Sequence, residues 1–112
     1  MNIFSIIMHI AYMVLGVEQA QKFPEALSAE EERECFKRCR QGDMKARDKL
    51  IEHNLRLVSH IVRKYYTSYQ SPDDLVSVGS LGLIKAIDSF NCENGARFAT
   101  YASKCIQNAI LS

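Results

Sequence analysis

The sequence lacks several features that would direct it to other classes of protein. No stretch alternates apolar and polar residues as a strand does, and neither an internal repeat nor a low-complexity segment is present. The nucleophile, base and oxyanion donors of an active site are not grouped along the chain, so we expect no enzyme and no cofactor. With 112 residues, the chain has room for one small domain and a tail.

The sequence also lacks a recognisable export signal, so its four cysteines are expected to be reduced thiols. Cys35 and Cys39 lie one helical turn apart, but no second pair at ligand spacing completes a site, and we expect no metal. His53 and His60 lie near arginines on the polar side of an expected helix, which is typical of a solvated basic face. The net charge of +1 predicts no overall attraction to nucleic acid, although residues 33–64 hold ten Lys or Arg against four Asp or Glu.

Charged side chains are absent from residues 1–17. This run lacks the basic start and the cleavage pattern of a secretory signal, and its length is marginal for a full membrane span. A leader helix that lies in, or partly inserts into, the inner face of the cell membrane fits better. The alternative is a helix that packs on the rest of the domain or self-associates. We therefore expect a leader over residues 1–22 and a helical domain over residues 23–112.

The rest of the chain contains residues that typically start and end helices. Ser28 and Glu31 form a capping box, Gly42 supplies a stop, and Asp43 can cap the next helix. Asn54 falls within the apolar arc of that helix, where we expect a buried amide hydrogen-bonded to a neighbouring helix. The expected helices cover residues 28 to about 40, 44 to about 66, 72–90 and 97–111. The predicted fold class is all-α, a small bundle of about four helices with an apolar N-terminal leader helix.

The helix over residues 72–90 has two unusual features. Leu81 lies in the middle of its polar side, where a docked partner would explain it, although single exposed leucines are also ordinary. Gly79, Gly82 and Ala86 form a narrow seam on the inner side. Each glycine weakens a helix interior by roughly 0.8–1.0 kcal/mol relative to alanine. The seam therefore predicts another helix backbone packed very close.

The helix over residues 97–111 carries what we call the outer strip, formed by Arg97, Tyr101, Lys104 and Asn108. No carboxylate interrupts this strip. Cations suit phosphates, an aromatic ring can stack on an unpaired base, and a carboxamide can pair with adenine, so the strip has the chemistry of nucleic-acid contact. A solvated helix face is the alternative.

Three segments carry a resemblance to a known family: LIEHNLRLVSHIVRKYY, DLVSVGSLGLIKAIDSF and, after a short turn, RFATYASKCIQNAI. Together they resemble region 2 of the bacterial sigma-70 family, the RNA polymerase subunits that choose promoters and help to open them. The match covers roughly residues 26–111. Within the family, the chain is most similar to the sporulation mother-cell type, which includes sigma-K and sigma-E. Proteins of this type are made as precursors with an apolar pro-sequence that an intramembrane protease removes.

The resemblance implies a binding site for core RNA polymerase. In the family, the helix that matches residues 72–90 binds the clamp-helix coiled coil of the largest core subunit. The positions implicated here are Asp74, Ser77, Val78, Ser80, Leu81 and Ile84.

The resemblance also implies capture of the non-template strand of the promoter −10 element. Phe90 and Tyr101 match aromatic positions that hold a flipped adenine, and Asn108 matches an amide that reads the upstream edge of the element. The chain has no tryptophan, and Lys104 and Cys105 stand where primary sigma factors carry a tryptophan pair, so unassisted melting is expected to be weak. The implied DNA-binding residues are Phe90, Arg97, Phe98, Thr100, Tyr101, Lys104, Gln107 and Asn108.

The sequence interpretation is thus a cytoplasmic sigma-factor module, comprising regions 1.2 and 2 and truncated in region 2.4. Its expected partners are core RNA polymerase, promoter DNA, a membrane through residues 1–22, and a processing intramembrane protease. Because the later family regions are absent, the polypeptide alone is not expected to direct normal initiation. The alternative is a membrane-tethered or truncated interaction module that binds core polymerase without reading a promoter.

Overall fold

Five helices make up most of the part of the chain that the structure describes. The structure is a computed structural model that describes residues 3, 6–7, 23–65, 72–93 and 95–112. The helices are α2 (Ala29–Arg40), α3 (Met44–Glu52), α4 (Leu55–Tyr65), α5 (Pro72–Ser89) and α6 (Phe98–Leu111). The all-α class is confirmed. The expected leader helix, except for Ile3, Ile6 and Ile7, lies outside the described residues.

The predicted helix starts are present as hydrogen bonds. The hydroxyl of Ser28 accepts from the backbone N–H of Glu31 at 3.1 Å, and the Glu31 carboxylate accepts from the backbone N–H of Ser28 at 3.3 Å. This capping box lowers the pKa of the Glu31 carboxyl, because the hydrogen bond from the Ser28 backbone favours the ionised form. The Asp43 carboxylate accepts from two N–H groups in the first turn of α3.

The single helix expected from residue 44 to about residue 66 is wrong, because the chain divides it into α3 and α4. The side-chain amide of Asn54 donates to the carbonyl of Leu50 at 2.7 Å, and the Asn54 carbonyl accepts from the N–H of Leu57. Asparagine often competes with the helix backbone in this way. The Asn54 amide is therefore satisfied by the preceding turn, and it is half-buried. The break allows α3 to pack on α2 while α4 packs on α5 and α6.

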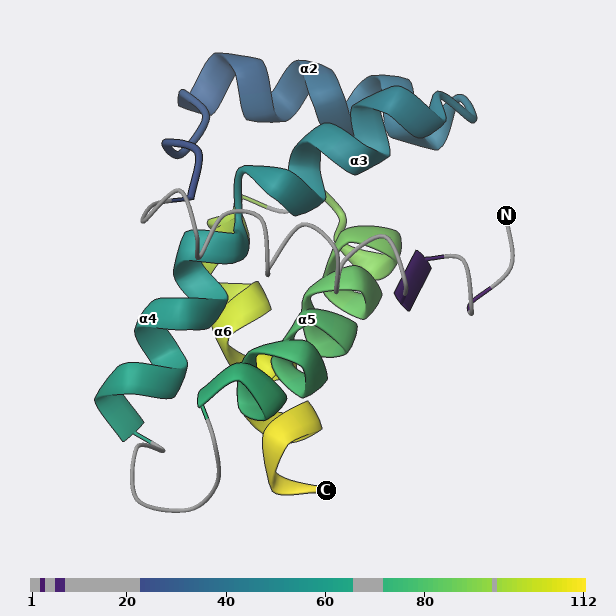
Figure 1. The fold of residues 1–112 in the computed structure, drawn as a ribbon. Helices are drawn as coiled ribbons and strands as arrows, with labels where there is room; N and C mark the ends of the chain where they lie inside the picture. The colour runs from purple at the N-terminus through teal and green to yellow at the C-terminus, as the bar shows by residue number, and fades with distance from the viewer. Residues whose placement is uncertain (1–2, 4–5, 8–22, 66–71, 94) are drawn as a thin grey trace.

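The helices form a bundle with a short cap at one end. Figure 1 shows α2 and α3 side by side across the top of α4, α5 and α6. An aromatic cluster joins the cap to the bundle, with the rings of Phe36, Phe90 and Phe98 at centroid distances of 5.0–5.2 Å. Tilted and edge-on ring pairs of this kind stabilise a core beyond simple burial. The cluster fixes the end of α5 and the start of α6 against α2.

The predicted glycine seam lies where α5 and α6 touch. A Cβ atom added at Gly82 would lie 2.5 Å from the carbonyl oxygen of Cys105 and 2.9 Å from the Cα of Ile106. At Gly79 the added atom would meet the Val58 side chain at 2.9 Å. The expected close approach of another helix backbone is thus confirmed at Gly82, and α6 is that helix.

Candidate functional site

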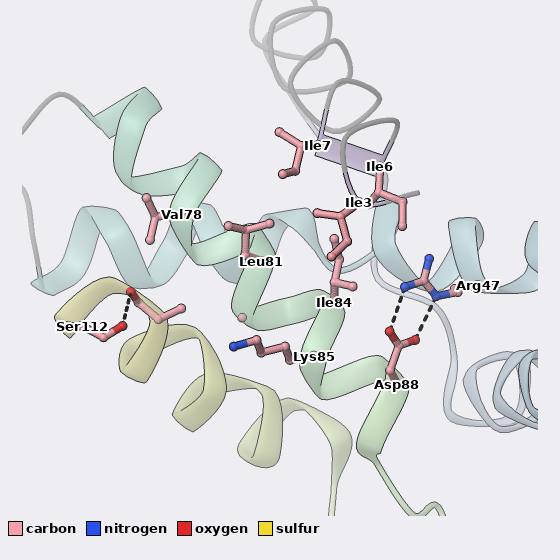
Figure 2. A pocket seen from close by; sticks show the side chains of 12 residues that line it. Ile3, Ile6, Ile7, Arg47, Val78, Leu81, Ile84, Lys85, Asp88 and Ser112 are labelled. Carbon is pink, nitrogen blue, oxygen red and sulfur yellow. Dashed lines mark hydrogen bonds and ion pairs between the residues drawn. The ribbon is translucent and has the colours of Figure 1, made fainter. Parts of the chain in front are cut away.

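An apolar groove runs along the exposed face of α5. Val78 and Leu81 are each 38% exposed, and Ile84 is half-buried beside them. The groove has a volume of about 470 Å³. Figure 2 shows Ile3, Ile6 and Ile7 of the N-terminal segment over this face of α5, and Arg47 and Asp88 beyond Ile84. The exposed leucine singled out in the sequence therefore belongs to a continuous apolar surface.

The six residues expected to contact polymerase do not all lie at this surface. Asp74 and Ser77 are exposed on the same helix, two turns and one turn before Leu81 respectively. Ser80 is completely buried, and its hydroxyl donates to the carbonyl of Val76 at 2.7 Å. A contact role for Ser80 does not fit this placement, because its side chain is satisfied inside the bundle.

An ion pair that the sequence did not reveal bounds the groove. Arg47 of α3 donates from Nε and Nη2 to the two carboxylate oxygens of Asp88 at 2.9 and 2.8 Å. These hydrogen bonds raise the pKa of the Arg47 guanidinium above its ordinary value. The third nitrogen, Nη1, is buried and has no hydrogen-bond partner among the described residues. The two residues are 41 positions apart, so no local pattern could have paired them.

The outer strip of α6 is mostly open to solvent. Arg97, Lys104 and Asn108 are exposed, as is Thr100, whereas Tyr101 and Gln107 are half-buried. Residues 98–111 include no Asp or Glu, so no carboxylate of α6 competes with a phosphate for these cations. The strip therefore keeps the chemistry that the sequence suggested, with Tyr101 partly covered.

Tyr101 is held in place by two contacts. Its ring lies beside that of Phe90, with centroids 5.6 Å apart and planes inclined by 37°. Its hydroxyl hydrogen-bonds with the hydroxyl of Ser89 at 2.7 Å. Phe90 and Phe98 themselves are only 7% and 2% exposed. In this structure both phenylalanines are core residues behind Tyr101, rather than surface rings open to a base.

Arg40 fixes the turn that leads from α5 to the strip. Its Nη2 donates to the carbonyls of Ile87 and Phe90 at 2.7 and 2.6 Å. These carbonyls lie at the C-terminal end of α5, where carbonyl groups have no N–H donor within the helix. The positive charge of Arg40 is also attracted to the partial negative charge at this end of the helix. Arg40, at the end of α2, thus caps the C-terminal end of α5 just before the chain turns toward α6.

Metal-ligand groupings are not found where the structure can be described. All four cysteines are free thiols there, and no three His, Cys, Asp or Glu side chains gather into a metal-binding group in those ranges. Burial raises the pKa of the Cys39 thiol. His53 is half-buried, and its Nδ1 hydrogen-bonds with the carbonyl of Glu25, so it ties the segment before α2 to α3.

Two candidate surfaces on one packed helical pair therefore characterise the described part of the molecule: an apolar groove on α5 and a carboxylate-free strip on α6. This arrangement defines a small all-α helical domain. The chain is a member of the Sigma-70 region 2 family, which it matches over residues 50–112.

Curated relatives include several RNA polymerase sigma factors of Bacillus and Clostridium species. The chain is 51% identical over 89 residues to the RNA polymerase sigma-28 factor of Bacillus thuringiensis subsp. kurstaki, covering 80% of this chain and 38% of that protein. It is 42% identical over 106 residues to the RNA polymerase sigma-K factor of Bacillus subtilis (strain 168), covering 95% and 36%. With the RNA polymerase sigma-E factor of Clostridium acetobutylicum it shares 44% identity over 88 residues, covering 79% and 37%. The chain thus spans less than two fifths of the length of these relatives.

None of the helices in the described part of the chain is long and apolar enough to span a bilayer.

Proposed function

We propose that this chain is the core-polymerase-binding and −10-promoter-binding module of a sigma factor of the sporulation type. The observation that carries the proposal is the apolar groove of Val78, Leu81 and Ile84, exposed on α5 of a Sigma-70 region 2 domain. In the family, this helix docks on the clamp helices of the largest polymerase subunit. Exposed apolar side chains gathered in one groove suit such a contact, because docking removes them from water.

The outer strip supports the second half of the proposal. Arg97 and Lys104 are exposed cations suited to phosphates, and Asn108 is an exposed amide suited to a base edge. Tyr101 is the aromatic ring best placed to stack on a base, since Phe90 lies behind it as a support. Phe90 and Phe98 accordingly act through the position of Tyr101. Thr100 and Gln107 flank the strip as secondary contacts.

The docking half is tested by binding of the chain to purified core RNA polymerase, with the isolated clamp-helix fragment as competitor. Replacing Asp74 and Leu81 together is expected to weaken binding while circular dichroism stays unchanged. Met44→Asp is the matched control, because Met44 is similarly exposed at 43% but lies on α3 outside the lining of the groove. Unchanged binding of the variant with both Asp74 and Leu81 replaced would refute the assignment of this surface as the docking site.

A second candidate is an interaction module that occupies core polymerase without reading a promoter. The burial of Phe90 and Phe98 favours it, because only Tyr101 is left as a partly exposed ring among the three aromatic residues expected at DNA. Retained binding to core polymerase without affinity for a single-stranded −10 oligonucleotide would select this candidate.

The N-terminal segment carries two further parts of the proposal: membrane association through residues 1–22 and removal by an intramembrane protease. Both rest on the uncharged, apolar composition of residues 1–17.

A further inference from the structure

Three isoleucines near the N-terminus cover the α5 groove incompletely. Ile3, Ile6 and Ile7 line it opposite the apolar side chains of α5, as Figure 2 shows. Ile3 nevertheless stays 72% exposed and Ile7 40% exposed, whereas Ile6 is half-buried and packs against the core. Because stabilisation by apolar contact scales with the area removed from water, Ile3 and Ile7 contribute little to this contact. A partner that buries the same α5 surface more completely can replace it.

The groove also has an unmet electrostatic requirement. Nη1 of Arg47 is buried at the groove with no acceptor among the described residues, while Nε and Nη2 are engaged by Asp88. A buried charged donor left without a partner is costly. Residues 1–17 contain no Asp or Glu, so no side-chain carboxylate of that run can meet the requirement.

The other charged side chains at the groove also favour a ligand that carries a carboxylate. Lys85 is exposed in the lining, and Asp88 is already held by Arg47. The lining therefore presents two cations and one carboxylate around an apolar floor. A ligand that complements it carries apolar side chains next to a carboxylate.

We propose, resting on the proposed function, that the groove binds a polymerase helix that places apolar side chains on Val78, Leu81 and Ile84 and a carboxylate on Arg47. The N-terminal isoleucines give way to that helix. Arg47 is thus the specificity-determining residue of the docking surface, because it distinguishes a partner helix that carries a carboxylate from the uncharged isoleucines that line the groove.

The test separates the contact with the partner from the internal ion pair. The full chain is titrated with purified core RNA polymerase at several salt concentrations. Arg47→Gln is expected to weaken binding roughly tenfold or more and to flatten its salt dependence, since it removes the cation itself. Asp88→Asn breaks the same internal pair but keeps that cation, so it should weaken binding by about threefold or less. Arg47→Lys, which keeps the charge, is expected to restore part of the lost affinity.

A double-mutant cycle identifies the partner group. Each Asp and Glu of the clamp-helix fragment is changed singly to Asn or Gln, and binding is measured against the wild-type chain and Arg47→Gln. One of these changes is expected to weaken binding to the wild-type chain and to have no further effect on Arg47→Gln.

The outcomes distinguish this proposal from the proposed function. If Leu81→Asp weakens binding while Arg47→Gln and Asp88→Asn act equally, the docking surface stands and the role of Arg47 is refuted. Additive effects of Arg47→Gln and every fragment substitution refute it as well. If Leu81→Asp leaves binding unchanged, both proposals fall.

Discussion

Replacing Gly82 by alanine tests how tightly α5 and α6 are packed. The added Cβ would lie 2.5 Å from the carbonyl oxygen of Cys105 and 2.9 Å from its carbon, and both atoms belong to the backbone of α6. A backbone cannot rotate away as a side-chain end can, so the two helices must separate. Overpacking of this kind costs about 1–3 kcal/mol. Alanine recovers about 0.8–1.0 kcal/mol through its helix propensity.

The expected net loss in free energy of unfolding is therefore about 1–2 kcal/mol, since the clash involves backbone and lies toward the upper end of that range. For a domain of this size, the loss lowers Tm by about 4–15 °C. Thermal and urea unfolding followed by circular dichroism measure it. Gly79→Ala is the comparison and is expected to cost less than Gly82→Ala, because its nearest obstacles are side-chain atoms of Val58 and Ile106, at 2.9 and 3.2 Å, and not backbone atoms. A Gly82→Ala variant as stable as the wild-type chain would refute the close backbone contact.

Three further predictions concern a base contact, a helix cap and the N-terminal leader. Tyr101→Ala should weaken binding to a single-stranded −10 oligonucleotide by roughly 1–3 kcal/mol, the scale of one stacked base, whereas Tyr101→Phe keeps the ring and most of the affinity; equal affinity of all three chains would argue against base capture. Ser28→Ala removes the cap of α2 and should lower the free energy of unfolding by about 0.5–2 kcal/mol. In the same urea titration, Ser77→Ala, at an exposed site within α5, should change little, and a similar loss for both serines would contradict the capping argument. Removing residues 1–21 is expected to release the chain from lipid vesicles, and continued sedimentation with vesicles would exclude a membrane role for the leader.

The parts of the fold that follow from local chemistry were predictable. The cap at Ser28, the start of α3 at Asp43 and the close packing at Gly82 each depend on residue types whose backbone preferences are strong. The break at Asn54 was missed because hydrophobic periodicity continues through it, and a side-chain hydrogen bond to Leu50 decides the outcome. Periodicity reports which face is apolar, but it does not report where a helix bends.

The candidate site was predictable only at its centre. Leu81 was found because an apolar residue on a polar face breaks the pattern. Arg47 was not found, because its role depends on Asp88 of another helix. A long-range ion pair of this kind leaves no spacing in the sequence. The burial of Phe90 and Phe98, in contrast, follows from helical periodicity, which puts both rings on the core-facing sides of their helices.

The hydrogen bonds from Arg40 to the carbonyls of Ile87 and Phe90 fix the spacing between two surfaces of the molecule. The groove lies on α5 and the strip on α6, and the aromatic cluster and Arg40 hold the turn between these helices. The distance and the angle between the two surfaces are therefore built into the fold. A polymerase bound at one surface would therefore hold a DNA strand bound at the other at a fixed distance and angle. An insertion between residues 90 and 97 would change that distance and angle without altering either surface.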